Sequence, residues 1–136
     1  MDRLTVERRS WLMGRVGSKN TTPELAVRRL VFSMGYRYRL HDIRLPGKPD
    51  LVFSGRRKVI FVNGCFWHGH KRCRYARLPK TNVDFWQEKI ERNRARDRKN
   101  KAQLTRLGWG VLVVWQCELR NIEKLSAKLY DFFERD

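Results

Sequence analysis

The 136-residue chain is long enough for one compact domain with a modest core and too short for two. Its apolar content of 41% predicts that the chain folds rather than staying disordered. The chain has 31 Lys and Arg against 14 Asp and Glu, which gives a formal net charge of +17. So strong a positive charge on a small domain indicates a polyanionic partner, nucleic acid first, rather than an inert soluble protein.

The N-terminal third of the sequence predicts two helices. The pattern favours a short helix over residues 4–13. Thr21-Thr22-Pro23-Glu24 is typical of a helix start, with a threonine cap, a proline near the first turn and an acid at the positive helix end. Apolar residues then recur at helical spacing until Gly35, which we expect to end this helix.

Three strands are predicted next, over residues 36–40, about 50–54 and 58–62, with a Ser54-Gly55 turn between the last two. A loop over residues 63–80 precedes a long basic helix, which Thr81 or Asn82 caps and which runs to about Leu107.

The C-terminal part begins with the apolar run 111–115, which predicts a strand buried on both faces. An amphipathic helix from about Ile122 to Phe133 ends the chain. A strand meander followed by a helical crossover predicts an α/β fold with a mixed central sheet flanked by helices. We expect residues 1–136 to form a single domain, in which residues 1–20 are a DNA-contacting segment.

No stretch of the sequence approaches the roughly 20 apolar residues of a membrane span, and the N-terminus lacks the apolar segment of a signal peptide. We therefore expect an intracellular protein without membrane contact, cytoplasmic and nucleoid-associated if the source is bacterial. Cysteines of such a protein are metal ligands or free thiols more often than disulfides.

The three cysteines and two of the histidines predict a structural zinc site. Zinc prefers four tetrahedral sulfur and nitrogen ligands, and short spacings let one loop supply several of them. The predicted ligands use every cysteine in the chain and are Cys65, His70, Cys73 and Cys117. His68 competes with His70 for the histidine position. Isolated Cys and His residues are usually core or surface groups, but this cluster within one basic loop favours the metal.

A second group of residues has the chemistry of phosphodiester hydrolysis, which needs a carboxylate to hold Mg²⁺ and a base near the attacking water. Asp50 follows Leu45-Pro46-Gly47-Lys48-Pro49 at a strand start and could be that carboxylate. Glu24 could reach the same region, and His68 could act as the acid or base. Taken alone, Asp50 could merely cap a turn and Glu24 merely complement a helix dipole.

The sequence resembles the Vsr family of mismatch endonucleases between about Arg9 and Leu119. The matching segments include Thr21-Thr22-Pro23-Glu24, Leu45-Pro46-Gly47-Lys48-Pro49-Asp50, Gly64-Cys65-Phe66-Trp67-His68, Phe85-Trp86, Arg96-Asp97-Arg98, Gly108-Trp109 and Val114-Trp115-Gln116-Cys117-Glu118-Leu119. The resemblance implies a restriction-endonuclease-like core and Mg²⁺-dependent nicking beside the thymine of a T·G mismatch, which arises when 5-methylcytosine deaminates.

The resemblance also implies residue roles. It matches Asp50 and the backbone carbonyl of Val62 to magnesium ligands, His68 to a catalytic histidine and Glu24 to a supporting acid. The cysteines named above and His70 match the zinc ligands. Some members have a histidine where this chain has Asn63, and asparagine cannot take a proton at neutral pH. We therefore place the general-base role on His68 and leave a role for Asn63 open.

Aromatic and basic residues predict how DNA is held. The resemblance implies that Phe66, Trp67 and Trp86 intercalate next to the T·G pair, where unstacking is cheapest. A core position is the alternative for Trp86, and Met13 is a further wedge candidate. DNA contacts are also predicted at Lys89 and Asn93 of the basic helix. An asymmetric mismatch suits a monomer, and other DNA repair proteins are conceivable partners.

Two alternatives to mismatch repair are compatible with these residues. One is a restriction or mobile-element endonuclease with the same core and a different target. The other is a zinc-stabilised DNA-binding module without catalysis, which the Asn63 substitution leaves open.

Overall fold

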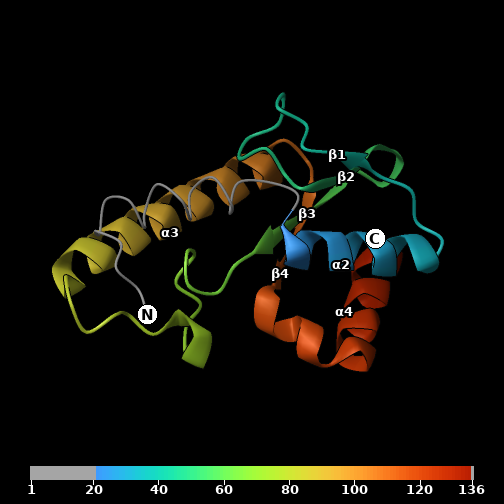
Figure 1. Cartoon of the computed structure of the whole chain (residues 1–136). Coiled ribbons are helices and arrows are strands. Elements are labelled where there is room, and N and C mark those ends of the chain that lie inside the picture. The colour runs from blue at the N-terminus through green and yellow to red at the C-terminus, as the bar shows by residue number, and fades with distance from the viewer. Residues whose placement is uncertain (1–20, 136) are drawn as a thin grey trace.

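The computed structural model describes residues 21–135, and these form a mixed four-stranded sheet with helices on both faces (Figure 1). The predicted helix 4–13 and Met13 lie outside the described residues. Within that range, no helix combines the length and hydropathy that crossing a membrane requires.

The first described helix, α2 (Thr22–Ser33), begins as its sequence predicts. The Thr21 hydroxyl accepts a hydrogen bond from the backbone N–H of Glu24 at 3.3 Å, and Pro23 lies in the first turn. Val27 and Val31, one helical turn apart, are buried against the sheet. This capped start fixes Glu24 at the end of α2 that lies nearest to the acidic cluster described below.

The sheet has the strand order β1 (Arg39–Leu40), β2 (Leu51–Phe53), β3 (Lys58–Asn63) and β4 (Gly110–Trp115). β2 pairs antiparallel with both β1 and β3, whereas β4 runs parallel to β3. A parallel pair needs a crossover, which α3 (Val83–Arg106) provides. Three short 3₁₀ turns complete the fold, at Ser54–Arg56, Arg74–Ala76 and Gln116–Arg120. The predicted mixed sheet with a helical crossover is confirmed.

The two faces of the sheet are covered by different helices (Figure 1). Successive strand residues point to opposite faces, so Ile60 packs with α2 and with α4 (Ile122–Glu134), whereas Val59 packs against Leu104 of α3. Phe133 of α4 completes the larger core cluster. The sheet therefore lies between two hydrophobic clusters, one on each face.

The first strand is shorter than its alternating sequence predicts. Only Arg39 and Leu40 pair with β2, which itself has three residues to offer. Tyr36 instead stacks on Phe133 with ring centroids 3.9 Å apart, and Tyr38 meets Phe53 edge-on. The alternation of tyrosine and arginine thus reflects ring packing on the core beyond the paired residues.

The apolar run of β4 forms a strand, as predicted, but it is not buried on both faces. Only Val114 is fully buried, because β4 is the last strand of the described sheet. Val111, Val113 and Trp115 are half-buried and face a cavity on the α3 side. The run of apolar residues marks the floor of that cavity.

Candidate active site and candidate metal centre

Three side chains from three elements meet in an acidic cluster at one end of the sheet. Glu24 lies in the first turn of α2, His41 follows β1 and Asp50 precedes β2. Their potential ligand atoms all lie within 4.8 Å of one another. His41 Nε2 is 3.0 and 2.9 Å from the two carboxylate oxygens of Glu24 and 3.9 Å from Asp50 Oδ1. The structure thus brings Glu24 to Asp50 and adds His41.

The two carboxyl groups have pKa values shifted in opposite directions, although burial acts to raise both. Burial raises the pKa of Asp50 to about 7, and the nearby charge of Glu24 acts in the same direction. Burial also acts to raise the pKa of Glu24, but hydrogen bonds from His41 and Arg28 outweigh it, so the pKa of Glu24 is lowered. Near neutral pH, Glu24 is ionised, and a cation bound beside Asp50 would favour release of the Asp50 proton to solvent.

Val62 of β3 is the immediate backbone neighbour of Asp50. Its N–H donates to Asp50 Oδ2 at 2.7 Å, so its peptide group lies beside the carboxylate. This N–H contact also opposes the rise in the pKa of Asp50. An oxygen-rich donor set of this kind suits Mg²⁺. The magnesium role of the Val62 carbonyl remains a prediction.

The second candidate catalytic group is an imidazole–carboxylate pair. His68 Nδ1 lies 2.6 Å from Asp97 Oδ2 of α3. A carboxylate bonded to one ring nitrogen fixes the orientation of the ring and favours a proton on that nitrogen, which leaves Nε2 able to accept one. His68 lines the same cavity as Asp50 and the buried Asn63, which ends β3. The cavity therefore combines a carboxylate that could hold a metal ion with a potential base.

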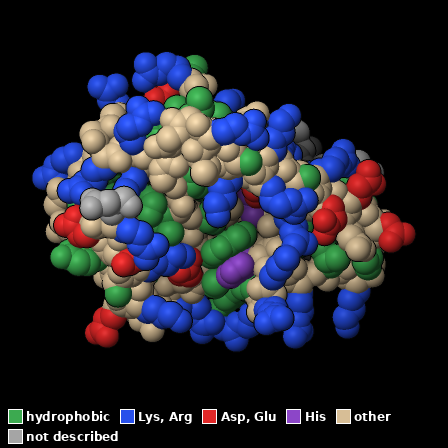
Figure 2. Space-filling view, turned by 180° about the vertical axis from the view of Figure 1, so that it is seen from behind, with side chains coloured by type: hydrophobic (Ala, Val, Ile, Leu, Met, Phe, Trp, Pro, Cys, Tyr) green, Lys and Arg blue, Asp and Glu red, His purple; other side chains and the backbone are tan. Residues whose placement is uncertain are grey.

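This cavity has a volume of about 560 Å³ and lies between the sheet and α3. Phe61, Val113 and Trp115 contribute apolar surface to it. Five basic side chains also line it, from Lys48, Lys71, Arg94, Arg98 and Lys101. Figure 2 shows histidine and hydrophobic side chains in a hollow among many Lys and Arg side chains. A positively charged hollow beside a carboxylate and an imidazole suits a phosphate of nucleic acid.

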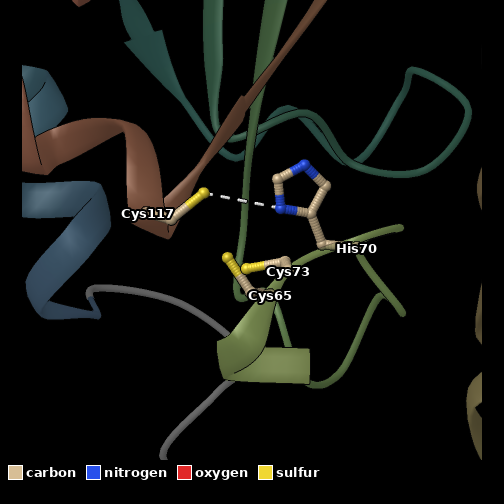
Figure 3. A group of neighbouring side chains, drawn as sticks. All are labelled: Cys65, His70, Cys73 and Cys117. Carbon is tan, nitrogen blue, oxygen red and sulfur yellow. Dashed lines mark hydrogen bonds between the residues drawn. The ribbon is translucent and has the colours of Figure 1, made fainter. Parts of the chain in front are cut away.

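A separate cluster of three thiols and an imidazole lies at the same end of β3 and β4 (Figure 3). Cys65 follows β3, Cys117 follows β4, and the loop between β3 and α3 adds His70 and Cys73. Their ligand atoms lie within 4.8 Å of one another, and His70 Nδ1 is 3.5 Å from Cys117 Sγ. The His70 ring also stacks on Trp115 at 4.0 Å.

The donor set of this cluster fits a tetrahedral metal ion such as zinc. Three sulfur atoms and one imidazole are ligands that zinc prefers in closed structural sites. Burial raises the pKa of Cys65 to about 12 and also raises that of Cys117, whereas hydrogen bonds outweigh the effect of burial and lower the pKa of Cys73. A bound cation would favour the thiolates that burial disfavours. The geometry separates the histidines: His70 joins the thiols, and His68 faces Asp97.

Gly69 lies between these two histidines and allows both orientations. Its φ of +59° is in the left-handed region, and a Cβ atom there would approach Ile90 Cγ2 to 2.6 Å and Arg94 Cδ to 2.7 Å. Only glycine lets the loop press so closely against α3. The two histidines that flank Gly69 therefore belong to different centres: His68 to the cavity and His70 to the thiol cluster.

Comparison with known proteins now identifies the family. A family model described as DNA mismatch endonuclease Vsr matches residues 1–74. A type II nicking enzyme, V.XorIIP, of Xanthomonas oryzae pv. oryzae is 56% identical, over 98% of this chain and 97% of that protein. The DNA mismatch endonuclease Vsr of Escherichia coli is 43% identical, over 87% of this chain and 75% of that protein.

The chain belongs to the Vsr family. It is a DNA endonuclease, and the predicted family is confirmed. The catalytic domain of homing endonuclease I-Bth0305I has a similar fold, with a TM-score of 0.56 and 23% identity over 83% of this chain and 94% of that domain. This likeness confirms the predicted restriction-endonuclease-like core.

Two residues of the site were not predicted. His41 is the one histidine outside the loop 63–80, and its position after a strand of alternating Tyr and Arg was the available signal. Asp97 is an acid flanked by Arg96 and Arg98 in a predominantly basic helix, and these neighbours gave no signal of its partner. Both residues are recognised only once the fold brings them to Glu24 and His68.

The aromatic residues predicted to enter DNA form one cluster in this Vsr-family nuclease. Phe66, Trp67 and Trp86 meet at centroid distances between 5.3 and 5.9 Å. Trp86 is only 1% exposed, so its ring supports the two loop aromatics, which are half-buried. Intercalation of these rings stays a prediction.

Lys89 and Asn93 of α3 hold the aromatic loop. Lys89 Nζ lies 5.0 Å from the Trp67 ring centroid, and Asn93 Nδ2 donates to the Trp67 carbonyl at 2.8 Å. Arg96 donates to Asn93 Oδ1 at 2.7 Å, so both ends of the Asn93 amide have partners within the protein. The DNA contacts predicted for these two residues are not tested by these distances.

The raised pKa of Asp50 predicts that Asp50→Asn is more stable than the natural chain at high pH. The folded-state pKa of about 7 lies above the ordinary value of 3.8, so the folded protein keeps a proton that the unfolded chain releases in this range. Stability is therefore lost as pH rises from about 4 to above 7. At pH 8 without divalent cations, we expect the variant to gain on the order of 2 kcal/mol in unfolding free energy, and much less at pH 5. Urea unfolding at both pH values measures this; an equal difference at both would contradict the assigned titration.

The arrangement of the thiols predicts about one zinc ion per chain in protein purified without chelator, as a single four-ligand site requires. Elemental analysis of His70→Ala should show loss of this zinc, because the His70 imidazole lies against Cys117. His68→Ala is the matched control and should retain it, because His68 pairs with Asp97. A natural chain that folds fully without zinc would contradict the assignment. Loss of zinc in His68→Ala but not in His70→Ala would also contradict it.

Proposed function

We propose that this Vsr-family endonuclease nicks one strand of duplex DNA 5′ of the thymine in a T·G mismatch, by Mg²⁺-dependent hydrolysis. The observation that carries the proposal is the convergence of Asp50 and His68 on one basic cavity. Asp50 and the carbonyl of Val62 would hold the magnesium ion. When bound, the ion supplies positive charge that stabilises the attacking and leaving oxygens of the phosphodiester.

The chain's own residues perform the remaining steps. His68, oriented by Asp97 at 2.6 Å, accepts the proton of the attacking water at Nε2. Glu24 supports the site as a buried anion beside Asp50. Asn63 receives no proton-transfer role; its amide can hydrogen-bond the phosphate or the water. Basic side chains around the cavity hold the DNA backbone.

Recognition of the mismatch is assigned to the aromatic loop. Phe66 and Trp67 are half-buried on the outside of the cluster built on Trp86. A ring pair supported by a buried third ring is stiff enough to enter a base step, and unstacking costs least beside a mismatch. The thiol and imidazole cluster would hold structural zinc and keep this loop in place.

A different target is favoured by one observation: several similar proteins, including V.XorIIP, are described as type II nicking enzymes. Their nicking of DNA agrees with the proposed chemistry, but their description does not mention a mismatch. The comparison of mispaired with fully paired DNA separates the two targets.

The decisive measurement is strand-resolved cleavage of a duplex with one T·G pair, beside its T·A counterpart, with and without Mg²⁺. We expect selective Mg²⁺-dependent nicking 5′ of the mispaired thymine. Asp50→Ala should abolish it, and His68→Ala should lower the rate by about 10²–10⁴-fold. Asp131→Ala, which removes an exposed acid of α4, is the matched control and should cleave normally. Equal nicking of both duplexes would instead favour a target other than the mismatch.

Binding of DNA by the basic cavity predicts a steep fall of affinity with salt. Each phosphate contact releases counterions and contributes about 0.9 to the slope of log affinity against log salt concentration. Arg98→Ala and Lys101→Ala, at the cavity, should each reduce that slope by about 1. Lys124→Ala on α4 is the charge-matched control, because α4 covers the other face of the sheet. A nearly flat plot for the natural chain would contradict binding through this surface; fluorescence anisotropy with Ca²⁺ in place of Mg²⁺ provides the affinities.

A further inference from the structure

His41 links the two acids of the active site through both its side chain and its backbone. Its Nε2 atom lies at 3.0 and 2.9 Å from the two carboxylate oxygens of Glu24. Its own N–H donates to the carbonyl of Asp50 at 3.2 Å, which extends the pairing of β1 with β2 by one residue. One residue thus connects the strand end that carries Asp50 with the helix start that carries Glu24.

The backbone of His41 is held in an uncommon conformation. Its φ of 47° lies in the left-handed region, which a residue with a side chain rarely adopts. Such a conformation persists where the surroundings over-determine it, and residues of this kind cluster at functional sites. Here the conformation directs the ring from the sheet edge toward α2, where Glu24 lies.

The contact exceeds what neutralising Glu24 requires. Glu24 is 2% exposed, and a buried carboxylate needs partners. The guanidinium of Arg28, one turn along α2, already pairs with one of its oxygens and supplies a positive charge. Arg28 belongs to the same helix as Glu24 and cannot set the position of that helix relative to Asp50. His41 follows β1, so its contact ties the Glu24 carboxylate to the strand pair that carries Asp50.

We infer that His41 is a positioning residue for DNA cleavage, which holds the carboxylate of Glu24 at a fixed place beside Asp50. The inference rests on the proposed role of these two acids in phosphodiester hydrolysis. Packing of Val27 and Val31 on the sheet places α2, but it does not by itself orient the Glu24 carboxylate. The imidazole of His41 contacts both oxygens of that carboxylate and lies 3.9 Å from Asp50 Oδ1, and we assign its effect on the reaction to the Glu24 contact.

Four variants test whether His41 acts through Glu24: His41→Gly, His41→Gln, Glu24→Gln and the double variant of His41→Gly with Glu24→Gln. Glycine adopts a positive φ without strain, so His41→Gly removes the imidazole and keeps the backbone. Glutamine retains a donor that can reach a carboxylate. Single-turnover rates at saturating DNA are compared, on the duplex that the natural chain cleaves best.

We expect His41→Gly to lower the single-turnover rate about 10–100-fold, as loss of an outer partner of a catalytic centre typically does, and His41→Gln to restore most of it. In the Glu24→Gln background, removing His41 should change the rate by no more than about twofold, because the residue through which it acts is already altered. Independent, multiplying losses would overturn the inference and would favour direct metal ligation by His41. An unchanged rate in His41→Gly would also overturn it.

Two further measurements separate positioning from folding and from the proposed target. The affinity for DNA with Ca²⁺ should be unchanged in His41→Gly, and thermal unfolding should show a coupling between positions 24 and 41 in the protein without DNA. Absence of that coupling would contradict the contact itself. Because the rates are measured on whichever duplex is cleaved, a natural chain that ignores T·G mismatches refutes the proposed target and leaves the test of His41 intact.

Discussion

The parallel pairing of β3 with β4 is the interaction on which the rest of the structure depends. Its register sets Val62 opposite Val114 and Asn63 opposite Trp115, so both strands end at the same edge. Cys65 and Cys117 therefore emerge side by side, two residues beyond the last pair. The crossover that a parallel pair requires is α3, which brings Asp97 to His68 and Asn93 to the aromatic loop.

At the acidic cluster, burial disfavours the ionised form of both carboxyl groups, whereas hydrogen-bond donors favour it. The balance differs between Glu24 and Asp50. Two carboxyl groups lie close together in a chain of net charge +17, yet Arg28 and His41 contact Glu24 more closely than any basic side chain contacts Asp50 among the described residues. Asp50 is left with a backbone N–H as its close donor. Its pKa of about 7 reflects burial first and the nearby charge of Glu24 second, and a divalent cation would favour the ionised form. The ionised form of Asp50 is thus poorly stabilised at the position where we propose that magnesium binds.

Much of this arrangement was accessible from local sequence patterns. The Thr21 cap, the helices and the mixed sheet were predicted from local patterns, and the histidine–cysteine loop predicted a metal cluster. The incomplete burial of β4 could not be predicted from the sequence, because it depends on whether a further strand pairs at the sheet edge. An apolar run has the same sequence in both cases.

The partners of the predicted residues were also not accessible, for a related reason. His41 and Asp97 lie 17 and 29 residues from the side chains that they contact, and such distances depend on tertiary packing. The choice between His68 and His70 as a zinc ligand likewise depends on which way the chain turns at Gly69. A sequence identifies candidate ligands by residue type, whereas the fold decides which of them share a centre.

The proximity of the two centres would let a metal ion bound by the thiols support the proposed catalytic site. The loop between β3 and α3 contains little regular structure, and ordering its backbone costs about 1–2 kcal/mol per residue. Its buried hydrophobic surface is confined largely to Cys65 and the aromatic cluster. Zinc in a structural site contributes about 10–16 kcal/mol, enough to offset much of this entropy. Since His68 and His70 are separated by one glycine pressed against α3, fixing the second histidine also fixes the first, so the proposed zinc would orient the general base as well as hold the loop.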